Sequence, residues 1–174
     1  MLRPTLMLVA FVTTGVLTTG VAAGTPKDDW PRITGELWIN THDKHTWHTG
    51  TGRNDELLGG HGDDTIYGTA GHDVIWTDHK ATGNTTKQKD KVYAGAGNDW
   101  IYASHGRNNI HGGAGQDTIR VWFGRGFVNC GPGGNDILYV SKTQNKKVKR
   151  KNCERVSHKS ARKAIHDRDN LRYP

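Results

Sequence analysis

Aspartates recur at a fixed spacing in the middle of the chain, each at the end of a short turn-forming stretch. Asp55, Asp64 and Asp73 lie nine residues apart, and a large aliphatic residue follows each of them two positions later. Carboxylates that a repeat brings together can ligate a hard divalent cation through oxygen. The same residues also favour tight turns without a metal, because aspartate side chains hydrogen-bond to the nearby backbone. The residue types alone therefore allow a cation site or plain turn formation.

A nine-residue repeat carries these aspartates and continues along the chain. Copies run from Gly50 to Trp76, and the same phase returns from Ala94 to Arg120. Aspartate occupies the same position in five copies of the repeat, and turn formation alone does not require this. The repetition therefore favours a cation site. Each copy predicts a six-residue turn followed by a three-residue strand whose middle residue points inward. The predicted inward residues are Leu57, Ile66, Ile75, Val92, Ile101, Ile110 and Ile119.

The repeat resembles the RTX, or haemolysin-type, calcium-binding repeat, whose pattern is GGxGxDxUx with U a large apolar residue. Residues 59–67, with the sequence GGHGDDTIY, carry it most clearly, and the resemblance extends over about residues 50–139. It implies an all-β fold, a parallel β-roll or β-solenoid in which two copies form one coil, with Ca²⁺ bound between turns on the same edge. The implied ligands are aspartate carboxylates and the carbonyl oxygens of the turns. The residues implied are Asp55, Asp64, Asp73, Asp90, Asp99, Asp117, Gly59, Gly60, Gly62, Gly68, Gly71, Gly95, Gly97, Gly112, Gly113 and Gly115.

The two edges of such a coil differ in sequence. One edge holds Asp55, Asp73, Asp99 and Asp117, and the other holds Asp64, Asp90, Asn108 and Gly126. We expect calcium to fill the gaps between successive aspartates of the first edge before the Asp64/Asp90 gap. The turn before Asp90 has no glycine, and the connection from Trp76 to Lys91 has 14 residues where the repeat needs six, which predicts an inserted loop near residues 77–90. Stacked carboxylates repel and the core is thin, so we expect folding to be coupled to calcium binding.

The composition does not suit an ordinary globular core, since hydrophobic residues make up 33% of the chain and glycine numbers 23. Such a chain needs stabilisation from metal ions or a disulfide. Cys130 and Cys153 are its two cysteines, and in an exported protein they predict a disulfide worth about 3 kcal/mol in the chain-entropy model. A pair of metal-binding thiols is the alternative, although no CxxC spacing accompanies them.

The C-terminal part is basic, with 12 Lys and Arg against three acidic residues from Ser141 onward. Residues 140–156 are expected to form a capping strand pair. The Cys-Gly-Pro-Gly turn at residues 130–133 and the Cys-Glu-Arg-Val ending at residues 153–156 look like exported calcium-binding repeat proteins of actinobacteria. By that resemblance, the cysteines clip the end of the roll, with either Asn135 or Asp136 in the ligand position. Residues 157–174 are expected to be a solvated basic tail, or one that holds an anionic cell-wall polymer or nucleic acid by electrostatics.

The N-terminal residues 1–23 are predicted to be a signal peptide, because Arg3 precedes a mostly apolar stretch and Val21-Ala22-Ala23 suits signal peptidase. An uncleaved anchor is the alternative, although the stretch is short for a membrane span. We therefore expect a secreted protein without a span in its mature part. Residues 24–49 are expected to form an N-terminal cap. His42, His45 and His48 sit three apart there and favour either a zinc or copper site or a polar loop.

No catalytic site is predicted. The chain has no HExxH or GxSxG motif, and nothing outside the repeats is long enough for a catalytic domain. The sequence therefore favours a non-catalytic calcium-binding protein with a structural, adhesive or accessory role. An electrostatic binder acting through the basic tail and a secreted enzyme of unrecognised type are the alternatives. A polar pocket away from the calcium-binding edges would indicate the enzyme.

Overall fold

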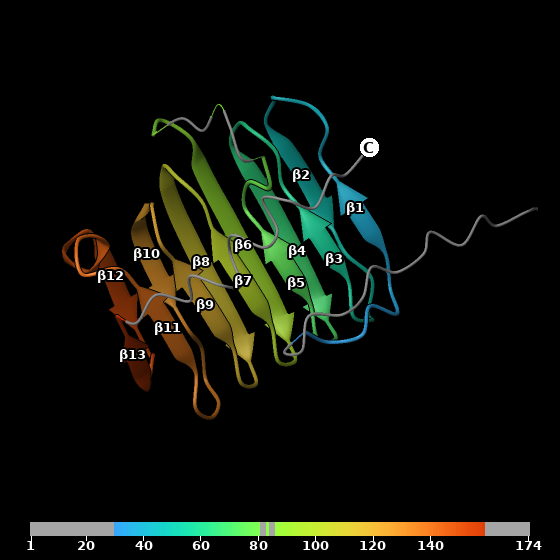
Figure 1. The fold of residues 1–174 in the computed structure, drawn as a ribbon. Helices are drawn as coiled ribbons and strands as arrows, with labels where there is room; N and C mark the ends of the chain where they lie inside the picture. The colour runs from blue at the N-terminus through green and yellow to red at the C-terminus, as the bar shows by residue number, and fades with distance from the viewer. Residues whose placement is uncertain (1–29, 81–82, 84–85, 159–174) are drawn as a thin grey trace, which may run out of the picture.

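The computed structural model describes residues 30–80, 83 and 86–158, which wind into a coil with one parallel sheet on each side (Figure 1). Successive strands alternate between the sheets, and every strand pair is parallel. The first sheet, called sheet A here, contains β1 (Leu37–Ile39), β3 (Glu56–Leu58), β5 (Val74–Trp76), β7 (Trp100–Ala103), β9 (Thr118–Val121), β11 (Ile137–Val140) and β13 (Arg155–Ser157). The second, sheet B, contains β2 (Thr46–Thr49), β4 (Asp64–Ala70), β6 (Lys89–Ala96), β8 (Arg107–Ala114), β10 (Arg125–Asn129) and β12 (Val148–Lys151). The predicted parallel β-roll is thus confirmed.

The core is a thin double column of aliphatic side chains between the two sheets. All seven residues predicted to point inward are at most 1% exposed. In sheet A the column runs through the paired residues Leu57, Ile75 and Ile101, and in sheet B through Ile66, Val92 and Ile110, one residue from each coil. Because residues two apart on a strand face the same side, the residue two positions before each core residue also points inward, beside the core and next to the turn. This geometry places the repeated aspartates in columns.

The strands of sheet B are longer than the three residues predicted. Strands β6 and β8 have eight residues each, because pairing continues from the core into the following turn. There Gly95 pairs with Gly113, and both have positive φ, at 114° and 115°. A Cβ on Gly113 would lie 1.9 Å from the carbonyl oxygen of Gly95, so the coils approach too closely for any side chain at this position.

The roll continues to both ends of the described range. Strands β1 and β2 form a first coil before the repeats, where the rings of Trp38 and His48 stack at 4.1 Å. At the other end, β12 and β13 join sheets B and A, respectively, so the expected capping strands do not pair with each other. The short 3-10 helix η1 (Gln144–Lys146) precedes β12. The predicted disulfide between Cys130 and Cys153 is present, with a Cα–Cα distance of 5.1 Å, and ties the last two coils together.

Several sequence predictions fall outside the described residues. These are the signal peptide at residues 1–23 and nearly all of the basic tail at residues 157–174. Among the residues that the structure describes, no helix has the length and apolar character needed to cross a membrane.

Candidate metal-binding edges

One edge of the roll carries an unbroken column of aspartates, which we call the regular edge. Its members are Asp55, Asp73, Asp99, Asp117 and Asp136, and each is at most 1% exposed. A hydrogen bond links each pair of neighbours, because the backbone N–H of one aspartate donates to the Oδ1 atom of the aspartate in the next coil. The four N···O distances lie between 2.8 and 3.0 Å. The backbone therefore fixes one oxygen of each carboxylate and repeats the arrangement coil after coil.

The second carboxylate oxygen is left without a partner along most of this edge. The Oδ2 atoms of Asp73, Asp99, Asp117 and Asp136 are buried and accept no hydrogen bond from the residues that the structure describes. Asp55 differs, because its Oδ2 accepts the backbone N–H of Thr51 at 2.7 Å. A buried carboxylate oxygen without a partner is costly, since it has given up water and received nothing in return. Four such atoms in register indicate that a positively charged group belongs there.

The electrostatics of the column agree with this conclusion. Burial raises the pKa of Asp73, Asp99 and Asp117 to about 7 each, and the neighbouring carboxylates in the column add to the effect. Burial also raises the pKa of Asp136. Without a cation, these carboxyl groups therefore hold their protons far more tightly than free aspartate does. A bound cation would favour the ionised form.

Backbone carbonyls supply further oxygens beside the orphaned carboxylates. A Cβ placed on Gly68 would lie 2.5 Å from Asp73 Oδ2 and 2.3 Å from the carbonyl oxygen of Ala94 in the next coil. At Gly112 the corresponding distances are 2.4 Å to Asp117 Oδ2 and 2.2 Å to the carbonyl oxygen of Cys130. An aspartate of one turn and a carbonyl of the next coil thus converge on the same space, which glycine leaves open.

This donor set fits calcium. Ca²⁺ accepts six to eight oxygen ligands in flexible geometry, and both carboxylates and backbone carbonyls serve. In the described ranges, no group of three or more His, Cys, Asp or Glu side chains could hold a metal ion by itself. An ion on the regular edge must therefore draw on backbone carbonyls as well as carboxylates.

The column extends beyond the aspartates of the matched copies, with an acidic side chain at one end and a backbone N–H group at the other. Asp136, and not Asn135, occupies the next position of the column, because its Oδ1 accepts the N–H of Asp117, whereas Asn135 is exposed with a φ of 68° and is the extra residue of its turn. The backbone N–H of Asp136 donates to Glu154 Oε2 at 3.0 Å. At the other end, the N–H of Glu36 donates to Asp55 Oδ1 at 2.7 Å. Glu154 follows Asp136 by one coil length of 18 residues, and that spacing is the signal that could have found it.

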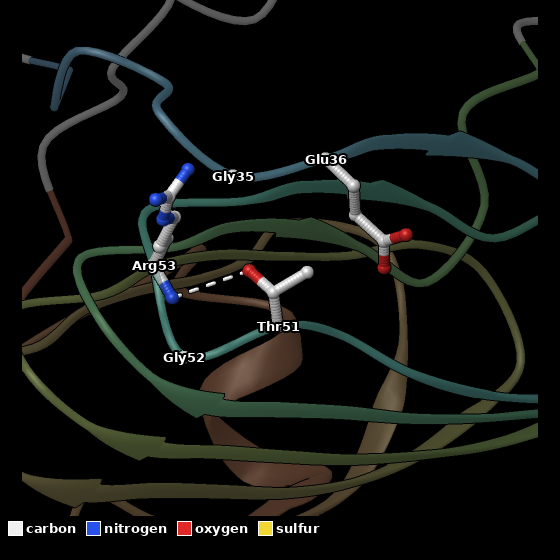
Figure 2. Close-up of a pocket in the computed structure, with 5 residues that line it drawn as sticks. All are labelled: Gly35, Glu36, Thr51, Gly52 and Arg53. Carbon is white, nitrogen blue, oxygen red and sulfur yellow. Dashed lines mark hydrogen bonds between the residues drawn. The ribbon is translucent and has the colours of Figure 1, made fainter.

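A pocket of about 520 Å³ lies at the start of the regular edge (Figure 2). It is lined by Gly35, Glu36, Thr51, Gly52 and Arg53, and Thr51 also holds Asp55 through its N–H and its hydroxyl group. The pocket therefore adjoins the aspartate column, whereas a pocket that indicated an enzyme was expected away from it.

The opposite edge, which we call the irregular edge, has a broken column. The N–H of Asp64 donates to Asp90 Oδ1 at 3.1 Å, as on the regular edge. The series then stops, because Asn108 turns its Nδ2 to the carbonyl of Ser104 and leaves its own Oδ1 buried without a partner. Gly126, which pairs with Asn108, offers no side chain. Burial raises the pKa of Asp64 to about 6 and that of Asp90 to about 8.

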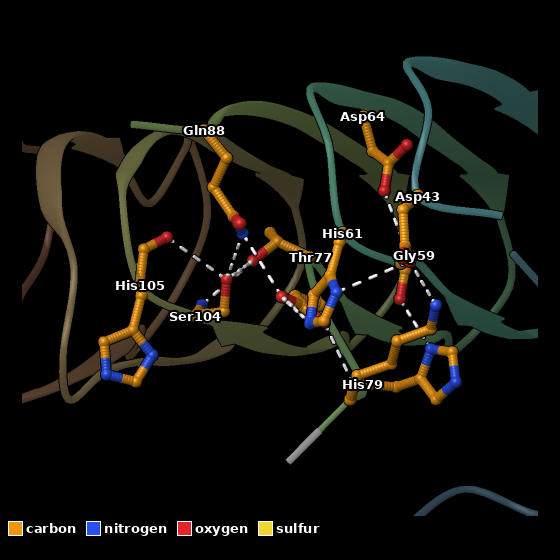
Figure 3. A network of polar contacts seen from close by, with 12 residues as sticks. Asp43, Gly59, His61, Asp64, Thr77, His79, Gln88, Ser104 and His105 are labelled. Carbon is orange, nitrogen blue, oxygen red and sulfur yellow. Dashed lines mark hydrogen bonds and ion pairs between the residues drawn. The ribbon is translucent and has the colours of Figure 1, made fainter. Parts of the chain in front are cut away.

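The inserted loop is anchored against this edge, because its polar residues Thr77, Asp78 and Gln88 are buried. Figure 3 shows Thr77 and Gln88 in the polar network there. Gln88 donates its Nε2 to Ser104 Oγ at 3.1 Å and, at 3.4 Å each, to one carboxylate oxygen of Asp78 and one of Asp90. The Nε2 atom of His61 lies 3.7 Å from Asp78 Oδ2. Amide and imidazole groups thus meet the carboxylates of the irregular edge. The sequence pattern missed Asp78 and Gln88 because the loop interrupts the nine-residue phase.

Further predicted site residues take their places around these columns. Gly60 donates its N–H to Asp64 Oδ2 at 2.9 Å. A Cβ on Gly59 would lie 3.0 Å from that same oxygen. Positive φ values between 111° and 140° occur at Gly62, Gly71, Gly95, Gly97, Gly113 and Gly115. These glycines allow the coils to stack closely, with their carbonyls beside the next turn.

The three histidines of the first coil do not form a metal site in the described structure. His48 lies in β2, stacks on Trp38 and places its Nε2 2.6 Å from Glu36 Oε1. His42 and His45 are exposed. The interpretation as polar surface histidines therefore fits the geometry better than a zinc or copper site.

Fold and edges together define a parallel β-roll with carboxylate columns between its coils. Residues 49–78 and 86–119 match the RTX calcium-binding nonapeptide repeat family in four copies, which confirms the resemblance seen in the sequence. The chain carries RTX repeats, and repeats of this kind bind Ca²⁺. The coils after residue 119 continue the roll outside the matched segments. No curated protein and no solved structure matches the chain.

Proposed function

We propose that this protein is a secreted, non-catalytic calcium-binding β-roll that completes its fold when calcium binds along the regular edge. The observation that carries this proposal is the register of four buried carboxylate oxygens that have no hydrogen-bond partner in the described part of the chain. The irregular edge takes calcium more weakly, because its loop already offers N–H groups to Asp78 and Asp90. The biological role that follows is structural, adhesive or accessory.

The chain's own residues have separate tasks in this proposal. Backbone N–H groups hold one oxygen of Asp73, Asp99 and Asp117 in place, which leaves the second oxygen free for the ion. Bound calcium supplies the positive charge that the buried column lacks. Since the coils are joined through this column, binding and folding are linked.

Calorimetric titration of the oxidised protein with CaCl₂, together with circular dichroism, tests the proposal. We expect Asp73→Ala to remove two adjacent sites, since Asp73 faces both Asp55 and Asp99. Asn108→Ala is the matched control on the irregular edge and should leave the number of bound ions unchanged. Equal losses in the two variants, or the same spectrum and melting temperature with calcium and with a chelator, would contradict the proposal.

Export and surface binding rest on the chain termini. Residues 1–23 support secretion, and N-terminal sequencing of protein recovered from the culture medium should begin at Gly24. The basic tail supports binding to an anionic cell-surface polymer. Deleting residues 157–174 should then weaken salt-sensitive retention on cell walls, while calcium binding stays intact.

A further inference from the structure

The outer face of sheet B is strongly cationic. Its strands contain seven basic residues, Lys89, Lys91, Arg107, Arg125, Lys149, Arg150 and Lys151, and all seven are exposed. The only two carboxylates in these strands, Asp64 and Asp90, are buried at the irregular edge. Arg150 is in register with the inward Val128, so the other six cations form the outward set. An acidic residue, Asp63, directly precedes β4 and accepts the backbone N–H of Lys89 through its Oδ1 at 2.8 Å.

The cations stand in register across the strands. Lys89 pairs with Arg107, and Arg107 pairs with Arg125. Neighbouring strands are about 4.8 Å apart, so these charges form a closely spaced row, and like charges directly opposite one another destabilise a sheet. Within the described residues, no ion pair joins any cation of this face to a carboxylate. A bound polyanion whose charges have a similar spacing would relieve the repulsion between these cations.

A row of aromatic rings lies beside the cations. Tyr93 stacks on Tyr67 and on His111, with ring centroids 4.9 Å apart in both pairs. These rings use their faces on one another and present mainly edges to solvent, which leaves little room for nucleobases to stack between them. At the end of the row, Trp47 is 67% exposed and meets Tyr67 edge to face. The face thus combines charge with an exposed aromatic side chain.

Two amides are interleaved with the cations and favour a ligand that carries hydroxyl groups. Asn109 pairs with Lys91, and Asn129 pairs with Lys151. Neither amide oxygen accepts a hydrogen bond from the described residues. A half-turn of either amide exchanges its oxygen and nitrogen, and the oxygen can then accept from a hydroxyl group. A phosphodiester backbone offers no such donor, whereas a sugar does.

The sheets differ in a way that singles out this face. The outer side of sheet A has Leu58 and Val74 fully buried and Tyr102 4% exposed, with Trp30 packed against Tyr102. Its Arg120 is 8% exposed and lies between the rings of Tyr102 and Tyr139. The guanidinium group of Arg120 is therefore packed between two rings of sheet A. On sheet B, Arg125 donates to the carbonyl oxygen of Thr86 at 3.1 Å and Arg150 donates to Asn145 Oδ1 at 2.6 Å, but no ion pair within the described residues joins a cation of this sheet to a carboxylate.

We propose that the outer face of sheet B binds an acidic polysaccharide laid across the strands, with its anionic groups on the row Lys89–Arg107–Arg125. Asn109 and Asn129 take sugar hydroxyls, and Trp47 contacts a sugar ring at one end. This surface borders the irregular edge, but its residues are distinct from the aspartates of both columns and from residues 157–174. It needs calcium only insofar as the roll must be folded.

The test measures binding of the calcium-loaded protein to chondroitin sulfate, with neutral dextran and a dT oligomer as comparison ligands. The variant Lys89→Gln/Arg107→Gln/Arg125→Gln should weaken chondroitin sulfate binding at least ten-fold and flatten its salt dependence, because fewer counterions are released. The matched control, Lys44→Gln/Lys142→Gln/Arg155→Gln, removes the same charge elsewhere and should change affinity less than two-fold. Trp47→Ala should weaken binding further.

Circular dichroism and calcium titration of both triple variants verify that they fold. An equal loss of affinity in the two triple variants would show that binding depends only on the net charge of the protein, and this result would overturn the proposal. The proposal would also be overturned if chondroitin sulfate did not bind. It would be overturned as well if the dT oligomer bound as tightly as chondroitin sulfate and lost as much affinity in the sheet B variant.

Discussion

The two edges of the roll start from the same repeat and handle buried carboxylates in opposite ways. On the regular edge the aspartate column is unbroken, and four carboxylate oxygens have no hydrogen-bond partner among the described residues. On the irregular edge the column ends at Asn108, and Gln88 from the inserted loop donates to the carboxylates. A buried column of carboxylates can thus be neutralised either by an ion taken up from solution or by amide groups of the protein itself. Only the first solution makes the fold depend on its surroundings.

The largest effect should come from removing the ion. A ligand present at a hundred times its dissociation constant stabilises the folded state by about 2.7 kcal/mol per site, so several sites on one edge exceed what a thin roll can lose. We expect a chelator to lower the melting temperature of the oxidised protein steeply, as measured by circular dichroism, and excess CaCl₂ to restore it. An unchanged melting temperature in chelator would mean that the regular edge is as self-sufficient as the irregular one.

Acid should partly replace calcium. The folded-state pKa of Asp73, Asp99 and Asp117 is raised to about 7, above the unfolded value, so the folded state binds more protons than the unfolded state between about pH 4 and 7. Stability of the calcium-free protein should therefore be greatest at low pH and fall as pH rises through 7. The melting temperature in chelator should be higher at pH 5 than at pH 8, and calcium should reverse this order. The same order with and without calcium would contradict the account.

A single substitution should separate the two kinds of neutralisation. Asp99→Asn keeps the acceptor for the N–H of Asp73 but removes a buried charge. We expect it to raise the free energy of unfolding in chelator and to lower it in calcium, by about 1–3 kcal/mol in each case. Asn108→Ala is the control, and its effect should have the same sign and size in both conditions. Denaturant unfolding with and without calcium measures both variants.

The smallest effect concerns backbone strain on the regular edge. Thr69 has a φ of 83° and pairs with Gly95, so a β-branched residue occupies a position that suits glycine. Thr69→Gly should raise the free energy of unfolding by about 1 kcal/mol through relief of that strain. Thr65→Gly, in the same strand but without positive φ, should lower it. If both substitutions destabilise the protein, Thr69 is not strained.

The regular features of the molecule could be predicted from the sequence, because the phase of the repeat fixes them. The inward residues from Leu57 to Ile119 and the aspartates from Asp55 to Asp117 all occupy their predicted places. The residues that the repeat pattern did not identify lie where inserted residues interrupt it. One extra residue in the turn left two candidates, Asn135 and Asp136, for one position of the column. The loop before β6 hid Asp78 and Gln88, whose contacts depend on a chain path that periodicity does not describe.

The hydrogen bonds of the regular edge also give the stack a direction. Each aspartate accepts a hydrogen bond from the backbone N–H of the preceding coil, and Glu154 does the same for Asp136. Glu154 directly follows Cys153, which forms the disulfide with Cys130. The disulfide therefore fixes the C-terminal end of this column of hydrogen bonds, whereas no covalent link fixes its N-terminal end in the described residues. Opening should start at the free end near Glu36 and travel toward the cysteines, so that a pulling force applied at the N-terminus peels coils off in sequence order.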